Sequence, residues 1–200
     1  LKGKRKKVDT CFTNKTPFVY VACFGDYIDL AYSTPRELKK KYGWKTEKNN
    51  IVPIIGEYDD PDNQRQSVLT MPISNGGNAI VFGAAGSGKE LMLTSIVYSS
   101  ITTHDSNEIN FYILDFRAET LGMFRNAPHV GEVLLSSESE KIGNLLKMIT
   151  QIAEERKKLF LDYNGSYDFY INHGGRQIPL IVIMINNIEG FMELYPDYED

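Results

Sequence analysis

The hydrophobic pattern from residue 78 onward alternates between two periods. Four short, mainly apolar runs are typical of strands in a parallel sheet, and they occupy residues 78–82, 109–116, 132–135 and 178–185. Longer segments separate them, and in these segments apolar residues recur at helical spacing. Because strands alternate with helices, the pattern predicts an α/β fold with a parallel sheet and helices on both faces.

The predicted helices differ in length. The first begins at Lys89, and the longest extends from Glu138 to about Tyr163 with an apolar stripe over a charged EERKK face. A short helix is expected before Pro128, because the residue that precedes a proline avoids the helical conformation. The apolar side of the first helix comprises Leu91, Leu93, Ile96, Val97 and Ile101. The run IPLIVIMI at 178–185 is expected to be the most buried strand.

Residues 1–50 differ in composition from the rest of the chain. They contain the charge run KGKRKK, an aromatic segment and the lysine-rich stretch PRELKKKYGWKTEKNN. We interpret 1–50 as an N-terminal extension or inter-module linker and 51–200 as a partial module, entered through the polar, turn-rich residues 57–66. The basic run could contact anionic lipid or nucleic acid, although a short solvated terminus is the commoner explanation. The sheet is expected to be incomplete at its C-terminal end.

The segment GAAGSGKE at 83–90 nearly matches a phosphate-binding loop. That loop reads G-x-x-x-x-G-K-[ST] between a strand and a helix, and Gly83, Gly88 and Lys89 satisfy it. A tight turn that binds nothing shows similar glycines, but here strand, loop and helix follow in the required order. We predict a P-loop NTPase fold of the RecA-like kind. Its candidate phosphate-binding residues are Gly83, Ala84, Ala85, Gly86, Ser87, Gly88, Lys89, Glu90 and Leu91.

Two positions that hold metal in such sites are changed. Glu90 stands where a serine or threonine hydroxyl ligates Mg²⁺, an ion that demands compact octahedral ligands. The run 178–185 ends in Asn186 and Asn187, where a hydrolase of this fold needs an aspartate. An amide carries no charge and takes no proton from water. We therefore include Asn186 in the nucleotide site, assign no catalytic or metal-ligating residue, and keep Glu189 as the alternative base.

Composition limits the classes of function. The 200 residues, 42% of them apolar, can bury one sizeable core, and the net charge of −4 gives no broad basic face, so no nucleic acid partner is expected. The run LIVIMI is far shorter than the roughly 18 residues that span a bilayer. Cys11 and Cys23 lack metal-ligand spacing and are expected as reduced thiols. His104 and His173 are isolated and expected in solvent.

A combination of motifs over residues 51–200 resembles the FtsK/SpoIIIE-type ATPase modules. The segments are YILDFRAETLGMF, NAPHVGEVLL, a helix with EERKKLF, and IPLIVIMINN. In detail they look like the tandem modules of the type VII secretion ATPases of the EssC/EccC kind. Within these motifs, His129 either packs at a loop corner or senses nucleotide. Arg117 either faces a phosphate or pairs with Asp115 at the surface.

The resemblance implies a membrane-anchored parent protein with several ATPase modules in series. This chain would be a later, degenerate module on the cytoplasmic side of the cell membrane, an ATPase by family that holds ATP weakly and has no Mg²⁺ at this site. Its partners would be the adjacent modules of the parent protein, exported small helical (WXG100-like) proteins and other membrane components of the secretion system. The alternatives are an active DNA-translocating ATPase of the FtsK type and a nucleotide-free interaction scaffold.

Overall fold

The structure is a computed structural model that describes residues 6–7, 20–21, 35–60, 63–84, 86–117 and 119–196. Cys11 and Cys23 lie outside these residues, as does most of the predicted extension at 1–50. The chain divides into two compact units, Leu1–His104 and Asp105–Asp200. The candidate phosphate loop therefore belongs to the first unit and Asn186 to the second.

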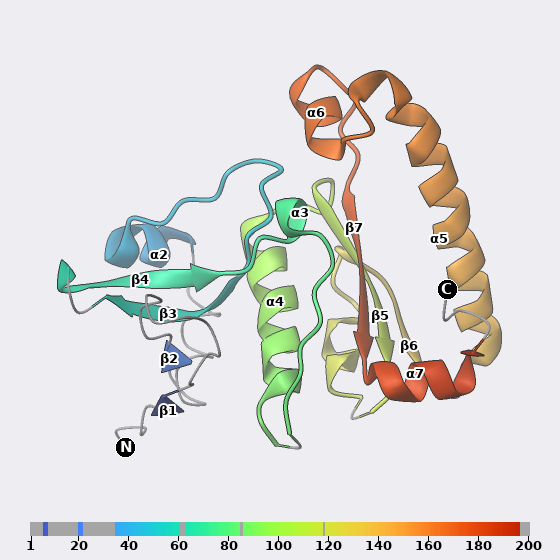
Figure 1. Ribbon diagram of the computed structural model, residues 1–200, viewed down its shortest axis with the longest axis horizontal. Coiled ribbons are helices and arrows are strands. Elements are labelled where there is room, and N and C mark those ends of the chain that lie inside the picture. Colours follow the sequence, from blue (N-terminus) through green and yellow to red (C-terminus); the bar gives the residue numbers. More distant parts are fainter. Residues whose placement is uncertain are drawn as a thin grey trace. The chain divides into compact units, whose positions relative to one another are not determined.

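The first unit combines antiparallel strand pairs with helices. Its elements are β1 (Lys6–Lys7), β2 (Tyr20–Val21), α2 (Pro35–Tyr42), β3 (Ile54–Asp60), β4 (Arg65–Thr70), α3 (Ile73–Gly76) and α4 (Lys89–Thr103). β1 pairs with β2, and β3 pairs with β4 in a hairpin. Helix α2 lies against this hairpin, where Leu38 and Ile54 form a small core with Tyr42, Trp44 and Val68 (Figure 1).

The polar, turn-rich residues 57–66 include the end of β3 and the start of β4. Strand β3 continues to Asp60 and β4 begins at Arg65, with Asp60 paired to Arg65 and Asp59 paired to Gln66. Arg65 and Gln66 are exposed, so this end of the hairpin needs no apolar side chains. The strands form because their main-chain groups pair with each other, which a polar sequence does not prevent.

Helix α4 confirms the helix predicted from Lys89. Hydrogen bonds link the helix and its C-cap residue to the first residue of β3 and to the segment before that strand. The Ile54 backbone N–H donates to Ser99 Oγ at 2.9 Å, and His104 Nε2 lies 3.2 Å from the Asn50 carbonyl oxygen. The His104 ring is buried, so the expectation of a solvated histidine was wrong at this position. A histidine just after a helix end is a usual partner for nearby carbonyls.

Residues 78–82 do not form the buried strand that their apolar character predicted. They have no strand assignment, and Ile80 and Phe82 are 71% and 86% exposed. A strand exists only when its backbone groups pair with a neighbour, and an apolar composition alone supplies no partner. The loop at 83–88 therefore follows an exposed segment of irregular structure.

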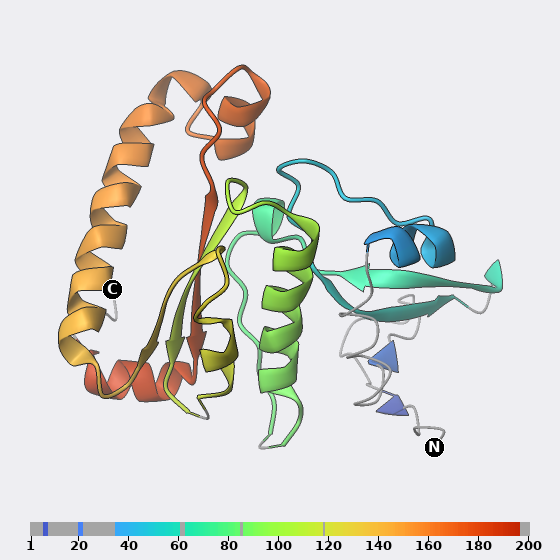
Figure 2. The same ribbon diagram turned by 180° about the vertical axis from the view of Figure 1, so that it is seen from behind.

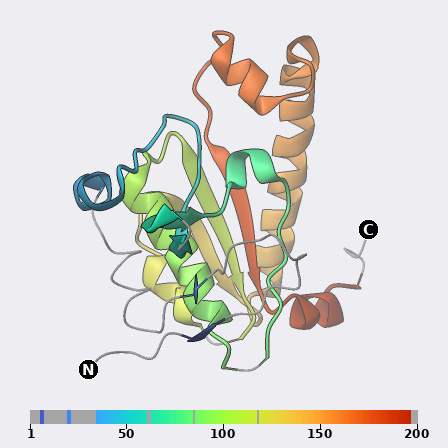
Figure 3. The same cartoon turned by 60° about the vertical axis from the view of Figure 1, so that its left-hand side comes forward.

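The second unit contains a parallel sheet. Its elements are β5 (Ile109–Asp115), η2 (Thr120–Phe124), β6 (Val130–Leu135), α5 (Ser139–Leu159), η3 (Leu161–Tyr163), α6 (Tyr167–Asn172), β7 (Leu180–Asn186) and α7 (Ile188–Leu194). Among the residues described, the strand order is β6-β5-β7, and all three strands run in parallel (Figure 3). This arrangement confirms the predicted α/β class and the predicted strands at 109–116, 132–135 and 178–185.

Both faces of the central strand β5 are largely buried, although Asn110 and Tyr112 are partly exposed. On one face Leu114 packs with Leu134 of β6, Leu145 of α5 and Phe191 of α7, and Figure 2 shows α5 running alongside the sheet. On the other face Phe111 and the other residues that alternate with it along the strand are fully buried. Such burial on both sides is the reason that β5 reads as a continuous apolar run.

Strand β7 is less buried than its composition predicted. Ile183 is 42% exposed, and only Met184 and Asn186 of this strand are buried. The physical reason is position, because β7 has a hydrogen-bonded neighbour on one side only within the three-stranded sheet. The central strand β5, with a similar composition, is the core strand instead.

Candidate nucleotide-binding site

The loop at 83–88 has backbone geometry that glycine permits. Gly86 has a φ of +72° and Gly88 a φ of +91°, in the left-handed region that side chains disfavour. At Gly83 a Cβ atom would lie 2.4 Å from Ser87 Oγ, so a larger residue would require the Ser87 side chain to move. The Ser87 backbone N–H donates to the Ala84 carbonyl at 3.2 Å and tightens the loop. Three glycines thus shape this loop.

Lys89 is the first residue of α4 and folds back over the loop. Its ammonium donates hydrogen bonds to the carbonyl oxygens of Gly83 and Ala84, the second at 2.8 Å. These two hydrogen bonds hold the positive charge of Lys89 close to the backbone of the loop that precedes α4. A phosphate oxygen is a stronger acceptor for an ammonium than a neutral carbonyl, so the lysine can exchange its partners for a phosphate.

The loop and the first turn of α4 offer N–H donors to a phosphate group, and they carry a glutamate at the position of the metal-binding hydroxyl. The first N–H groups of α4 have no acceptor within the helix and carry its positive dipole end, which favours an anion. Glu90 follows in the first turn, where a metal site needs a hydroxyl. The nearest downstream hydroxyl, that of Thr94, donates back to the Glu90 carbonyl at 2.8 Å. No compact neutral ligand for Mg²⁺ is offered at these positions.

The structure places the predicted site residues in two groups. Gly83, Ala84, Gly86, Ser87 and Gly88 form the loop, and Lys89, Glu90 and Leu91 form the first turn of α4. Ala85 lies outside the described residues. Asn186 is the last residue of β7 in the second unit.

Asn186 is hydrogen-bonded to a carboxylate that the sequence did not identify as its partner. Its Nδ2 donates to Asp115 Oδ1 at 2.8 Å, and Asp115 Oδ2 accepts the backbone N–H of Leu121 at 3.1 Å. Both side chains are buried, Asp115 with 1% and Asn186 with 5% of its surface exposed. The two residues end neighbouring strands and are register partners. That shared position was the available signal, because parallel strands end at one edge of a sheet.

The residues after Asn186 begin a helix. Asn187 has a φ of +71°, and its side-chain oxygen accepts the Gly190 backbone N–H at 3.4 Å as the N-cap of α7. Asparagine is among the preferred residues for this role. Glu189, the candidate replacement base, is exposed in the first turn of α7. Its catalytic role stays a hypothesis.

His129 and Arg117 have different surroundings. The His129 side chain is buried, and its carbonyl accepts the Phe111 backbone N–H at 2.7 Å, which agrees with packing at a loop corner. Arg117 is exposed, and its backbone N–H lies 3.4 Å from Asp115 Oδ1. The Arg117 backbone therefore faces the carboxylate of Asp115.

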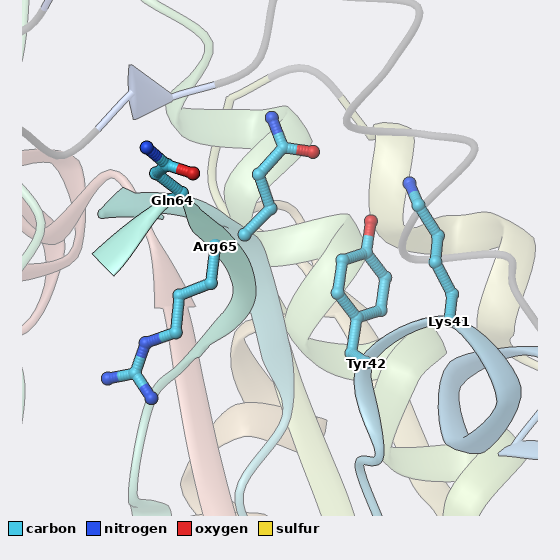
Figure 4. Close-up of a pocket in the computed structure, with 5 residues that line it drawn as sticks. Lys41, Tyr42, Gln64 and Arg65 are labelled. Atoms are coloured by element: carbon cyan, nitrogen blue, oxygen red, sulfur yellow. The ribbon is translucent and has the colours of Figure 1, made fainter. Parts of the chain in front are cut away.

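A separate, open surface cavity of about 410 Å³ lies in the first unit beside α2 and β4 (Figure 4). It is lined by Lys41, Tyr42, Gln64, Arg65 and Gln66. The Tyr42 hydroxyl donates to Glu57 at 3.0 Å, and burial raises the pKa of this phenol. None of these lining residues belongs to the phosphate loop, so the cavity is distinct from the candidate nucleotide site.

The first unit contains a glycine-rich loop before a helix, and the second contains a parallel α/β sheet. Both features are typical of the P-loop NTPase fold. The chain belongs to the FtsK/SpoIIIE family, whose model matches residues 20–170. Membership of this ATPase family implies nucleotide binding. Among the described residues, no helix has both the length and the apolar character required to span a bilayer.

The similar proteins are type VII secretion ATPases. The chain is 28% identical over 155 residues to ESX secretion system protein EccC of Geobacillus thermodenitrificans, covering 77% of this chain. It is 32% identical over 126 residues to EccC5 of Mycobacterium marinum, covering 62% of this chain. It spans only 10% and 9% of the lengths of these two relatives.

Solved structures of the same group share the fold. EssC (ATPases 2 and 3) from Geobacillus thermodenitrificans matches 77% of this chain and 30% of its own, with a TM-score of 0.67 and 26% identity. EccC (ATPases 2 and 3) of Thermomonospora curvata, in complex with a signal sequence peptide, matches 78% of this chain and 29% of its own, with a TM-score of 0.64 and 26% identity.

Proposed function

We propose that this chain is a degenerate ATP-binding module of a membrane-anchored type VII secretion ATPase. It lies on the cytoplasmic side of the membrane and regulates export or engages exported proteins, and it is not the main motor. One observation carries the proposal. The phosphate cradle of three glycines and Lys89 is kept, while Glu90 and Asn186 replace the two residue types that hold Mg²⁺.

The energies favour retained binding over retained hydrolysis. A hydrogen bond to a charged group, such as one from Lys89 to a phosphate, contributes about 1.5–3 kcal/mol. A metal ion stabilises the charge of the transition state by several kcal/mol more. When the metal ligands are missing and the cradle is kept, hydrolysis loses more than binding does. The module then responds to nucleotide without consuming it.

The relatives support the proposed partners. Two of the similar structures are described as ATPases 2 and 3, so those proteins carry several ATPase modules in one chain. The neighbours of this module would accordingly be further modules of its parent protein. The structure from Thermomonospora curvata contains a signal sequence peptide, which supports exported proteins as partners. We propose that these are small helical (WXG100-like) proteins. Other membrane components of the secretion system complete the proposed set.

The test is a titration of labelled ATP with and without Mg²⁺, followed by an assay of phosphate release. The proposal predicts saturable binding that needs no Mg²⁺ and no turnover above a blank. Lys89→Ala should weaken the binding, and Lys147→Ala, which removes an exposed lysine of α5, is the matched control. Turnover would instead favour an active DNA-translocating ATPase. Absence of binding would favour a nucleotide-free scaffold.

A further inference from the structure

The contact between Asn186 and Asp115 fixes which atom of the amide faces the carboxylate. Asp115 Oδ1 and Asn186 Nδ2 are 2.8 Å apart in a buried position. A carboxylate only accepts hydrogen bonds, so the amide must present its nitrogen and not its oxygen. The carboxylate of Asp115 also accepts the Leu121 backbone N–H through its other oxygen. Its two oxygens are therefore both engaged by neutral N–H donors.

An aspartate in place of Asn186 would have nearly the same shape and the opposite polarity at this contact. Two carboxylates would then face each other in a buried site, where like charges repel strongly. A divalent cation between them would remove that repulsion, and such a pair would resemble the acidic sites that bind Mg²⁺. With the residues present, the Asn186 amide donates into the position where a cation would have to lie. The pair therefore does not fit a metal ion.

We infer that Asn186 is the residue that makes this sheet edge independent of metal, because its amide N–H donates a hydrogen bond to Asp115 from the position that a cation would otherwise occupy. Asp115 and Asn186 are a matched pair, so neither changes freely without the other. The inference deepens the proposed function. It rests on that proposal only for the assignment of this sheet edge to a nucleotide site. The pair itself is a property of the fold and can be tested without nucleotide.

The pair also holds the segment that follows β5. The Phe116 backbone N–H donates to the Asn186 carbonyl at 3.1 Å, and the Leu121 N–H donates to Asp115. Leu121 is fully buried in η2. Repulsion at Asp115 would therefore loosen the link to Leu121, and amide exchange at Phe116 and Leu121 reports on the pair locally.

The experiment compares four proteins in EDTA and in excess Mg²⁺ or Mn²⁺ by thermal unfolding and amide hydrogen exchange. They are the wild-type chain, Asn186→Asp, the exchanged pair Asp115→Asn with Asn186→Asp, and the control Asn187→Asp. The control makes the same chemical change one residue away, at an N-cap where aspartate and asparagine are equivalent. No nucleotide is present, so a failure of the nucleotide proposal leaves this test intact.

In EDTA, Asn186→Asp should lower the unfolding midpoint by about 5–10 °C, and exchange at Leu121 should accelerate. The exchanged pair should regain most of this loss, since it again places one amide beside one carboxylate. Mg²⁺ or Mn²⁺ should raise the midpoint of Asn186→Asp only. The inference is overturned if Asn186→Asp loses no more than Asn187→Asp, if the exchanged pair regains nothing, or if the cation stabilises the wild type equally.

Discussion

The Lys89 ammonium donates to the Ala84 carbonyl oxygen at 2.8 Å, so the lysine of the phosphate loop is bound to the loop it serves. This contact preorganises the positive charge beside the first turn of α4. A phosphate that binds there replaces one acceptor of the Lys89 ammonium with a stronger one.

Lys89→Ala should weaken ATP binding by a factor of about 10 to 100, the equivalent of one charge-assisted contact. Isothermal titration in EDTA measures the effect, because the metal plays no part in the predicted interaction. Lys147→Ala should leave the affinity unchanged. Equal affinities of Lys89→Ala and the wild type would show that the loop does not contact the nucleotide.

The same change from glycine to alanine should have opposite effects at two positions. Gly88→Ala forces a Cβ into the left-handed region at a φ of +91° and should destabilise the fold by about 1–2 kcal/mol. Gly143→Ala lies within α5, where a Cβ meets nothing within 4 Å, and should stabilise by about 0.5–1 kcal/mol. Urea unfolding of both variants gives the signs. Two effects of the same sign would contradict the loop geometry.

Position in the sheet should decide the cost of shortening an isoleucine. Ile113→Ala, in the central strand, removes a fully buried side chain and should cost about 2–5 kcal/mol. Ile183→Ala, in β7, removes one that is 42% exposed and should cost about half of that or less. Chemical denaturation of both variants measures the difference. A larger loss for Ile183→Ala would place β7 at the centre of the sheet.

The stability of the fold should depend on pH in the acid range because of Glu138. The Lys141 hydrogen bond, followed by the Leu135 backbone N–H, lowers the pKa of Glu138 below its usual value. Because the pKa of Glu138 is lower in the folded state, its ionised carboxylate stabilises the fold at pH values above the unfolded pKa. This contribution to stability is lost as pH falls through the folded pKa.

Glu138→Gln should therefore be less stable than the wild type at neutral pH, and the two unfolding curves should converge in acid. Thermal unfolding from neutral pH downward, at low and high salt, checks this. Lys141→Ala should show part of the same loss, because it removes the first cause of the shift. If the difference in stability between Glu138→Gln and the wild type persisted unchanged in strong acid, the charge of Glu138 would not be its cause.

Local patterns predicted some features and missed others for definite reasons. The apolar run at 109–116 predicted β5 correctly because burial on both faces requires that composition. The run at 178–185 has the same character, but neighbours in space decide that β7 is an edge of the three-stranded sheet. The segment 78–82 had the composition of a strand without a pairing partner.

Within the candidate site, the sequence predicted the glycine positions of the loop but not the side-chain contacts. The motif indicated positions that need a left-handed backbone, and Gly86 and Gly88 have it. Asp115 and Asn186 are 71 residues apart in the chain, so no local pattern shows that one donates to the other. The sequence shows that Asn186 stands in place of an acid, but only the fold shows that Asp115 is the hydrogen-bond partner of Asn186.

The most direct test of the central claim is the dissociation constant of ATP as a function of free Mg²⁺. We predict that the affinity stays the same or weakens as Mg²⁺ is added, because Lys89 and the loop bind the phosphates while Glu90 and Asn186 replace the hydroxyl and the carboxylate that hold the metal in such sites. Affinity that increases tenfold or more with Mg²⁺ would contradict it, since about 1.4 kcal/mol of metal-dependent binding would then need ligands at this site.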